Sequence, residues 1–278
     1  MHGFAIRCVT TPPTRQSHIR LAECRFRRKG AGSVNRQLPG QGRYGITESP
    51  SPVTTAGDVT VVADYDKRRT AMVDTQVRPS DVTKFPIIAA MLTVPRELFV
   101  PDNLREAAYV GENLDLGGGR VLLEPRTFAK MLDALDIGPT DLVLDIGCGY
   151  GYSTAVLTRL AEFVVGVEDN ADRAAEAQGL LSERGIDNAG VVEGPLVEGW
   201  RDSAPYDVIL LEGGAETVPD TLTDQLKEGG RIAALFMEGG LGTVRIGYNI
   251  DGSVTWRYAF NAAAPVLAGF ERQETFAF

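Results

Sequence analysis

From residue 142 onward, short apolar runs alternate with longer amphipathic stretches. The apolar runs predict strands at Leu142–Ile146, Phe163–Glu168, Ala189–Glu193, Tyr206–Glu212 and Arg231–Met237. The amphipathic stretches predict helices over residues 152–161, 170–184 and 219–227. This alternation is typical of consecutive βαβ units. We therefore expect an α/β fold in which helices cover both faces of a doubly wound, mostly parallel sheet.

The last part of this region follows a different pattern. Apolar side chains occupy every second position from Val244 to Ile250 and again from Val254 to Phe260. Between these runs stands Asp251-Gly252, a pair that favours a type I′ turn. We therefore expect a C-terminal antiparallel hairpin joined to the parallel sheet, which a plain dinucleotide-binding domain does not have.

Residues 62–137 predict a helical cap before the sheet. Ser80 and Asp81 offer an N-cap to the second of its helices. The glycine-rich segment Leu116–Arg120 predicts a flexible loop. The helices of this region are expected over residues 65–77, 82–92 and 125–135.

The first 61 residues differ from the rest in composition. Residues 1–57 contain nine Lys/Arg and two Asp/Glu, a net charge of +7, whereas residues 58–278 contain nineteen and thirty-five, a net charge of −16. Such a Pro- and Gly-interrupted segment buries too little apolar surface to offset its ordering entropy. We expect residues 1–61 to be a disordered basic leader or the result of a start codon assigned too far upstream. A transit peptide and a basic arm for nucleic acid stay open as interpretations.

Composition excludes several classes of protein and site. No apolar run approaches the ~20 residues that span a bilayer, and the acidic body lacks the basic stripe of most nucleic-acid-binding proteins. Both histidines, His2 and His18, lie in the leader, so the body cannot build a Ser-His-Asp triad or a Cys-His pair. Cys148 is the only cysteine after Cys24, which leaves no disulfide and no Cys/His metal site to expect in the body.

The strongest motif lies where the first predicted parallel strand meets its helix. It reads Asp145-Ile146-Gly147-Cys148-Gly149-Tyr150-Gly151-Tyr152, and glycines let a backbone turn sharply and approach a ligand closely. The dinucleotide fingerprint would need glycine in place of Tyr152. Asp145 can hold a cationic amino group, and Glu168, at the end of the next strand, can accept both hydroxyls of a ribose.

This combination resembles the cofactor site of class I S-adenosylmethionine-dependent methyltransferases, which have a Rossmann-like fold. The resemblance implies S-adenosylmethionine as cofactor and S-adenosylhomocysteine as product. Expected cofactor contacts are Asp145, Gly147, Cys148, Gly149, Gly151, Tyr152, Glu168, Glu193 and Gly194. A pyridine-nucleotide oxidoreductase is the alternative from another class.

Further segments resemble the protein-L-isoaspartate (D-aspartate) O-methyltransferase family between about residues 66 and 237. Ala90–Pro101 is similar to its "AM..VPRE.FVP" signature, and Gln225–Arg231 to its "QLKPGGRL" segment. The resemblance implies a cytoplasmic enzyme that methylates the carboxylate of isoaspartyl residues in damaged proteins, with a protein or peptide as acceptor. It divides the domain at 62–278 into a helical cap with acceptor loop (62–137) and a cofactor-binding core (138–278).

The chain departs from the family in the acceptor loop, which elsewhere reads "G-Q-T-I-S-x-P". Val121 and Leu123 replace the two hydroxyl residues, and Glu124 places an anion beside an anionic substrate. Arg120 and Arg126 can donate to a carboxylate, although Arg120 can also pair with Glu124. We take Arg120, Leu123 and Glu124 as candidate acceptor-loop residues. A methyltransferase for another acceptor and a cofactor-binding paralogue without repair activity stay open.

Overall fold

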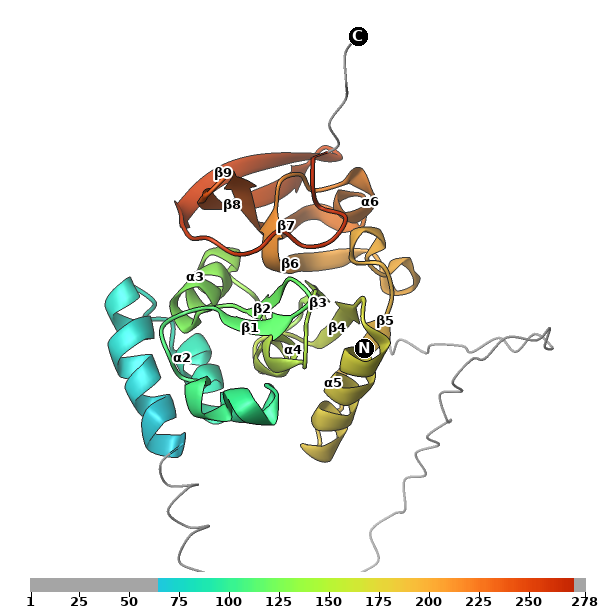
Figure 1. Cartoon of the computed structure of the whole chain (residues 1–278). Coiled ribbons are helices and arrows are strands. Elements are labelled where there is room, and N and C mark those ends of the chain that lie inside the picture. Colours follow the sequence, from blue (N-terminus) through green and yellow to red (C-terminus); the bar gives the residue numbers. More distant parts are fainter. Residues whose placement is uncertain (1–64, 273–278) are drawn as a thin grey trace, which may run out of the picture. The chain divides into compact units, whose positions relative to one another are not determined.

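The computed structural model describes residues 65–272, which lie in one compact unit of the chain (Figure 1). Its centre is a seven-stranded sheet in the order β5-β4-β3-β6-β7-β8-β9. Strands β5 to β7 pair in parallel, and β8 and β9 add in antiparallel fashion. The strand bounds are β3 Leu142–Ile146, β4 Phe163–Glu168, β5 Ala189–Glu193, β6 Tyr206–Ala215, β7 Leu226–Glu238, β8 Leu241–Ile250 and β9 Ser253–Asn261.

This order confirms the predicted fold class. The chain runs outward from β3 to β5 and then crosses back to β6 on the other side of β3. Ligands of doubly wound proteins bind at such a reversal, outside the carboxyl ends of the strands. The sheet therefore places a candidate site where β3 and β6 end.

The two faces of the sheet bury alternate residues of each strand. Val143 and Val208 belong to one core with residues of α2 (Phe85–Thr93), α3 (Pro125–Leu135) and α4 (Tyr152–Leu157). The opposite face forms a second core, in which Leu144, Ile146, Ile209 and Leu211 pack against Leu222, Leu267 and Phe270. Successive side chains of a strand point to opposite faces, so the continuous apolar strands are explained by burial on both sides.

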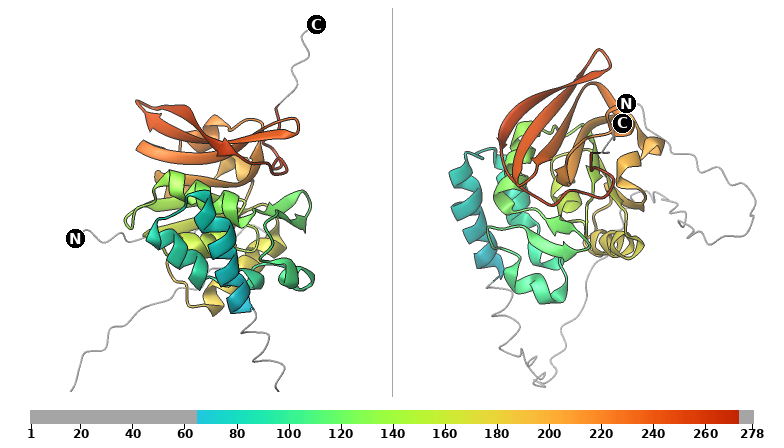
Figure 2. Two further views of the ribbon diagram at one scale, coloured as in Figure 1. Left: turned by 90° about the vertical axis from the view of Figure 1, so that its left-hand side faces the viewer. Right: turned by 45° about the horizontal axis from the view of Figure 1, so that its top comes forward.

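The predicted hairpin is present at the end of the sheet. Ile250 pairs with Ser253, and Asp251 and Gly252 have φ of 54° and 74°, as a type I′ turn requires. Figures 1 and 2 show β8 and β9 extending the sheet beyond β7.

The helical cap is also present, with one change at a helix start. Residues 65–72 form an α-helix that continues as a π-helical stretch at Val73–Val77. Helix α2 begins at Phe85, and Lys84 is its N-cap, so the predicted cap at Ser80-Asp81 is wrong. Asp81 adopts a left-handed conformation (φ 67°) that ends a short 3₁₀ turn instead.

Of the remaining helices, α3 and α5 (Ala171–Glu183) are long and the others are short. Helix α3 covers the residues predicted for it, whereas α4 ends four residues early, at Leu157. The helix predicted at 219–227 is shorter in the structure, because β7 already begins at Leu226, which pairs with Tyr206. The other helices are α6 Asp220–Thr223 and the 3₁₀ helices Arg78–Ser80, Arg96–Leu98, Asp102–Ala107, Leu196–Glu198 and Arg201–Ser203.

Residues 114–122 form a second, two-stranded sheet where a flexible loop was predicted. Strands β1 (Leu114–Gly117) and β2 (Arg120–Leu122) pair in antiparallel fashion. Gly117, Gly118 and Gly119 all have φ between 64° and 82°, a conformation that glycine adopts without a Cβ penalty. The glycines therefore build the tip of the β1–β2 hairpin.

The sequence also led to expectations about a leader and about membrane-spanning helices. The predicted leader, residues 1–61, lies outside the described residues. Within residues 65–272, no helix is both long and apolar enough to cross a membrane.

The segment after β9 returns to the sheet and closes over the end of β6. Gly214 donates its N–H to the carbonyl oxygen of Pro265 at 2.8 Å and accepts from the N–H of Leu267 at 2.8 Å. A Cβ at Gly214 would lie 2.7 Å from the carbonyl oxygen of Ala264 and 2.8 Å from Cγ of Met237. This close approach depends on glycine and fixes the backbone next to the candidate site.

We expect Gly214→Ala to lower the free energy of unfolding by roughly 1–3 kcal/mol, because the segment has to shift away from β6. Gly190→Ala is the matched control, since a Cβ at this strand glycine would have no atom within 4 Å; its effect should stay within about 0.5 kcal/mol. Urea denaturation measures both. Equal stabilities of the two variants would contradict the packing described here.

Candidate functional site

Three carboxylates and a glycine turn meet where the central strands end. Asp145 lies in β3, Glu168 ends β4 and Glu212 lies near the end of β6; all three are buried. The turn after β3 is held because the N–H of Gly147 donates to the carbonyl oxygen of Val167 at 2.8 Å. The residues predicted to bind the cofactor are therefore gathered at the crevice of the sheet.

Glycines shape this turn by their left-handed conformations. Gly147, Gly149 and Gly151 have φ of 81°, 58° and 89°, and Gly151 caps α4. A Cβ at Gly151 would lie 3.3 Å from Cβ of Ala177 in α5. The predicted motif thus serves both the sharp turn and the close packing of this turn against α5.

Asp145 presents an oxygen without a partner to this crevice. Its Oδ2 accepts from Oγ of Ser153 and Oγ1 of Thr154, each at 2.7 Å, whereas its buried Oδ1 accepts from no group of the described protein. Burial raises the pKa of Asp145 to about 6, although both hydroxyls lower it. The free Oδ1 suits a cationic amino group.

Glu168 is ringed by donors. Gly149 donates its N–H to Oε2 at 2.9 Å, Nη2 of Arg120 lies 3.2 Å from Oε2, and Nε of Arg173 lies 3.0 Å from Oε1. Burial raises the pKa of Glu168, while both arginines lower it. Two arginines thus surround the carboxylate that was predicted to receive ribose hydroxyls.

Arg120 points toward the glycine turn and Glu168 at the crevice of the sheet. Its side chain is buried, and it donates from Nη2 to the carbonyl oxygen of Gly147 at 2.6 Å and pairs with Asp169 at 3.2 Å. A pairing of Arg120 with Glu124, which the sequence left open as an alternative, is therefore not formed. Glu124 instead accepts from Oγ1 of Thr127 at 2.6 Å as the N-cap of α3.

The other acceptor-loop residues separate into core and surface. Leu123 is 1% exposed and belongs to the core that contains α3, and its carbonyl oxygen accepts from Nη2 of Arg96 at 2.7 Å. Val121 is half-buried. A smaller hydroxyl residue in place of Leu123 would leave a void in that core. Glu124, in contrast to Leu123, lines a cavity.

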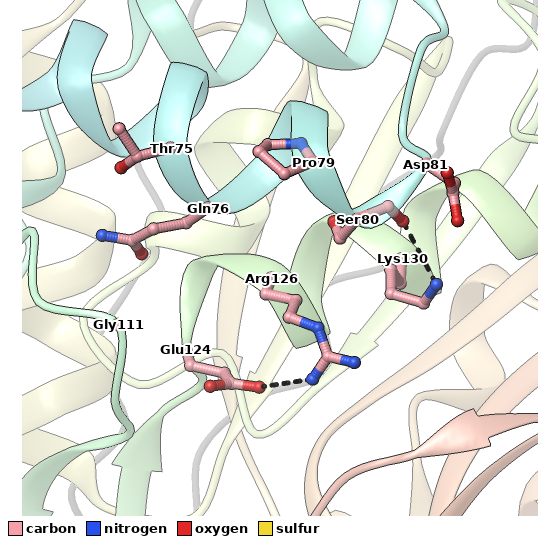
Figure 3. A pocket seen from close by; sticks show the side chains of 9 residues that line it. All are labelled: Thr75, Gln76, Pro79, Ser80, Asp81, Gly111, Glu124, Arg126 and Lys130. Atoms are coloured by element: carbon pink, nitrogen blue, oxygen red, sulfur yellow. Dashed lines mark hydrogen bonds and ion pairs between the residues drawn. The ribbon is translucent and has the colours of Figure 1, made fainter.

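That cavity, of about 500 Å³, lies beside the helical cap (Figure 3). Arg126 extends toward Glu124, with 3.8 Å between Nη1 and Oε1, and Nζ of Lys130 donates to the carbonyl oxygen of Ser80 at 3.2 Å. Basic, acidic and amide side chains therefore face one polar cavity. It is lined by Thr75, Gln76, Pro79, Ser80, Asp81, Gly111, Glu124, Arg126 and Lys130.

Cys148 and Tyr152 are buried parts of the motif. Burial raises the pKa of the Cys148 thiol well above its usual range, which suits a small packing residue and not a nucleophile. The ring of Tyr152 packs against Phe99 and Phe128, with centroids 6.1 Å and 5.7 Å apart. Tyr152 therefore anchors the first turn of α4.

Glu193 and Gly194 follow the neighbouring strand. Glu193 is exposed at the end of β5, in register with Glu168, and the N–H of Gly194 donates to the carbonyl oxygen of Glu168 at 3.0 Å. Both residues therefore lie beside Glu168. Their contact with the cofactor stays a prediction.

The sequence interpretation missed two arginines. Arg173 stands four residues after Asp169, a spacing at which helical side chains meet, and this signal was available. Arg96 is fully buried; its Nε donates to the carbonyl oxygen of Ala108 at 2.7 Å, and its guanidinium lies 4.8 Å from the ring centroid of Tyr152. Nothing in the spacing of Val94–Pro101 predicts such burial.

The chemistry of the groups at the crevice fits the predicted cofactor. The free Oδ1 of Asp145 suits the amino group, the carboxylate of Glu168 suits ribose hydroxyls, and the glycine turn admits a close ligand. Among residues 65–272, no cluster of three or more His, Cys, Asp or Glu could hold a metal ion.

Comparison with known proteins agrees with this geometry. Residues 67–239 match the family described as "Protein-L-isoaspartate(D-aspartate) O-methyltransferase (PCMT)". A protein-L-isoaspartate O-methyltransferase of Syntrophus aciditrophicus is 39% identical over 168 residues, which are 60% of this chain and 77% of the relative. One of Opitutus terrae is 39% identical over 177 residues, 62% of this chain and 76% of the relative.

Solved structures support the same placement. A protein-L-isoaspartate O-methyltransferase aligns with a TM-score of 0.63 at 25% identity, over 74% of this chain and 66% of that one. A Plasmodium falciparum protein described by the same activity, in complex with S-adenosyl-L-homocysteine, aligns with a TM-score of 0.61 at 17% identity, over 73% of this chain and 97% of that one, and shows the fold alone. The chain therefore belongs to the protein-L-isoaspartate (D-aspartate) O-methyltransferase family.

Proposed function

We propose that this protein transfers the methyl group of S-adenosylmethionine to the carboxylate of isoaspartyl residues in damaged proteins. The observation that carries the proposal is the arrangement at the sheet crevice: Asp145 with a free oxygen, a left-handed glycine turn and Glu168, in a chain of this family. We expect the reaction to take place in the cytoplasm, with a protein or peptide as the acceptor.

The residues of the site suit this reaction because it needs no proton transfer. Residues 58–278 contain no histidine, and the acceptor carboxylate is already ionised at pH 7. Bound S-adenosylmethionine supplies a methyl group on positively charged sulfur, so that the carboxylate oxygen displaces a neutral thioether. The chain has to position the two reactants and exclude water.

The β1–β2 hairpin supports the exclusion of water. A Cβ at Gly149 would lie 3.2 Å from Cδ1 of Leu116, so an apolar side chain of the hairpin covers the glycine turn. Asp145 and Glu168 then hold the cofactor beneath it. Removal of water strengthens the ionic contacts of the crevice.

We place the acceptor peptide in the polar cavity of Figure 3. Residues 120–124 run from the cofactor crevice, where Arg120 lies, to this cavity, which Glu124 lines. Arg126 and Lys130 offer donors to backbone carbonyls and acidic groups of a peptide. A folded or unfolded protein segment fits such an open polar cavity better than a small apolar substrate does.

A methyltransferase for a different acceptor is the second candidate, and one observation favours it. Val121 and Leu123 supply no hydroxyl at the two positions where the family has one, and Leu123 is buried in the core. A cofactor-binding paralogue without repair activity shares this observation. Neither candidate methylates isoaspartyl residues, so one assay of methyl transfer to an isoaspartyl peptide distinguishes both from the proposed function.

The test is transfer of labelled methyl from S-adenosylmethionine to an isoaspartyl peptide, with the aspartyl peptide of the same sequence as control. We expect label in the isoaspartyl peptide only. Titration with S-adenosylhomocysteine shows that the preparation binds cofactor. Binding without transfer to either peptide would overturn the repair function and favour another acceptor or a binding paralogue.

The pKa of Asp145 leads to a pH prediction for cofactor binding. Because burial raises this pKa to about 6, protonation removes the negative partner of the amino group as the pH falls. Affinity for S-adenosylhomocysteine should fall about tenfold between pH 7 and pH 5, as measured by calorimetry. Asp145→Asn should bind more weakly at pH 7 and lose most of this dependence. The same pH profile in both proteins would exclude Asp145 as the titrating group.

A further inference from the structure

Arg120 occupies the space that the glycine turn opens. Its Nη2 lies so close to the turn that a Cβ at Gly147 would be 2.5 Å away from it. The same nitrogen donates to the carbonyl oxygen of Gly147 at 2.6 Å and lies 3.2 Å from Oε2 of Glu168. The side chain is 3% exposed, so the guanidinium fills the crevice from within the protein.

These contacts use acceptors that a bound cofactor needs. Ribose hydroxyls would compete with Arg120 for the oxygens of Glu168, and the guanidinium lies on the side of Gly147 where a Cβ would point. The cofactor and Arg120 therefore compete for the same acceptors. A buried guanidinium that loses its carboxylate partner is strongly destabilised unless another anion replaces it.

We infer that Arg120 alternates between two carboxylates: that of Glu168 before the cofactor binds, and that of the acceptor afterwards. The inference rests on the proposed function, because it takes the acceptor to be a carboxylate. A guanidinium matches a carboxylate with two parallel N–H donors. Arg120 thereby supplies donors in an acceptor loop whose hydroxyl residues are replaced by Val121 and Leu123.

The surroundings of Arg120 allow it to leave Glu168. It begins β2, directly after Gly117–Gly119, and a Cβ at any of these glycines would have no atom within 4 Å. These three adjacent left-handed glycines have free space around them and form a pivot about which the segment that begins with Arg120 can turn. Arg173 lies 3.0 Å from Oε1 of Glu168 and remains as a counter-ion when Arg120 moves.

An order of binding follows. The cofactor has to displace Arg120 from Glu168, and only then is the guanidinium available to the acceptor. Loss of Arg120 should therefore have opposite effects on the two ligands: tighter binding of cofactor and weaker binding of acceptor. A residue with a merely structural role would weaken both.

The test compares Arg120→Gln with wild type and with Arg159→Gln, which removes the same charge from an exposed position. Calorimetry measures the dissociation constant for S-adenosylhomocysteine, and methyl transfer measures KM and kcat for the isoaspartyl peptide. For Arg120→Gln we expect cofactor affinity to rise about tenfold and the peptide KM to rise about tenfold or more, by the loss of charge-assisted bonds. Arg159→Gln should leave both values unchanged.

Arg120→Lys is a second, more conservative variant in case Arg120→Gln does not fold. It also tests whether the two parallel N–H donors of the guanidinium are needed. It keeps the charge but forms single bonds, so both shifts should have the same signs and be smaller. Unchanged or weaker cofactor affinity in both folded variants would overturn the displacement of Arg120. Unchanged peptide KM would overturn its role toward the acceptor.

If the proposed function is wrong, the wild-type protein itself gives a result that differs from the failure of the Arg120 inference. Wild-type protein that binds S-adenosylhomocysteine but methylates no isoaspartyl peptide would overturn the repair function and the acceptor half of the inference. The cofactor titrations need no acceptor, and tighter binding by Arg120→Gln would still support displacement from Glu168.

Discussion

A buried carboxylate at the end of a parallel strand needs opposite charge or hydrogen-bond donors, and the site depends on how Glu168 obtains them. One donor is the N–H of Gly149, which points inward only because the glycine turn is left-handed. Opposite charge comes from Arg120, on the β1–β2 hairpin, and from Arg173, in α5, which forms an ion pair with Glu168. Glu168 thus ties three segments together that are far apart in the sequence.

The same constraint links the cofactor and acceptor sides. Arg120 begins the strand that leads through Leu123, in the core, to Glu124, at the polar cavity. Residues only a few positions apart in one segment therefore reach both the crevice of the sheet and the polar cavity. A reaction between a carboxylate and a positively charged donor needs such positioning and no proton shuttle, which agrees with a body that lacks histidine.

Much of this arrangement could be predicted from the sequence because its signals are local. Strands β3, β4 and β5 cover the residues predicted. The apolar runs of β3 and β4 are buried on both faces, whereas β5 at the edge of the sheet is only half-buried. The Asp251-Gly252 turn was predicted because few dipeptides tolerate two positive φ angles. The glycine turn with Asp145 and Glu168 was recognisable from spacing alone.

The rest depends on contacts between distant residues. Strands β1 and β2 are only four and three residues long, too short for a periodic pattern, so the hairpin was predicted as a loop. The partner of Arg120 lies 48 residues away, whereas the sequence suggested only the nearby Glu124 or a substrate carboxylate as alternatives. The early start of β7 at Leu226 likewise follows from pairing with Tyr206 and not from helix propensity.

The most direct test of this account is a crystal structure of the protein with S-adenosylhomocysteine bound. The account predicts ribose hydroxyls on Glu168, the amino group near Oδ1 of Asp145, and the guanidinium of Arg120 away from the carbonyl oxygen of Gly147. A ligand bound elsewhere, with Arg120 still paired to Glu168, would contradict it.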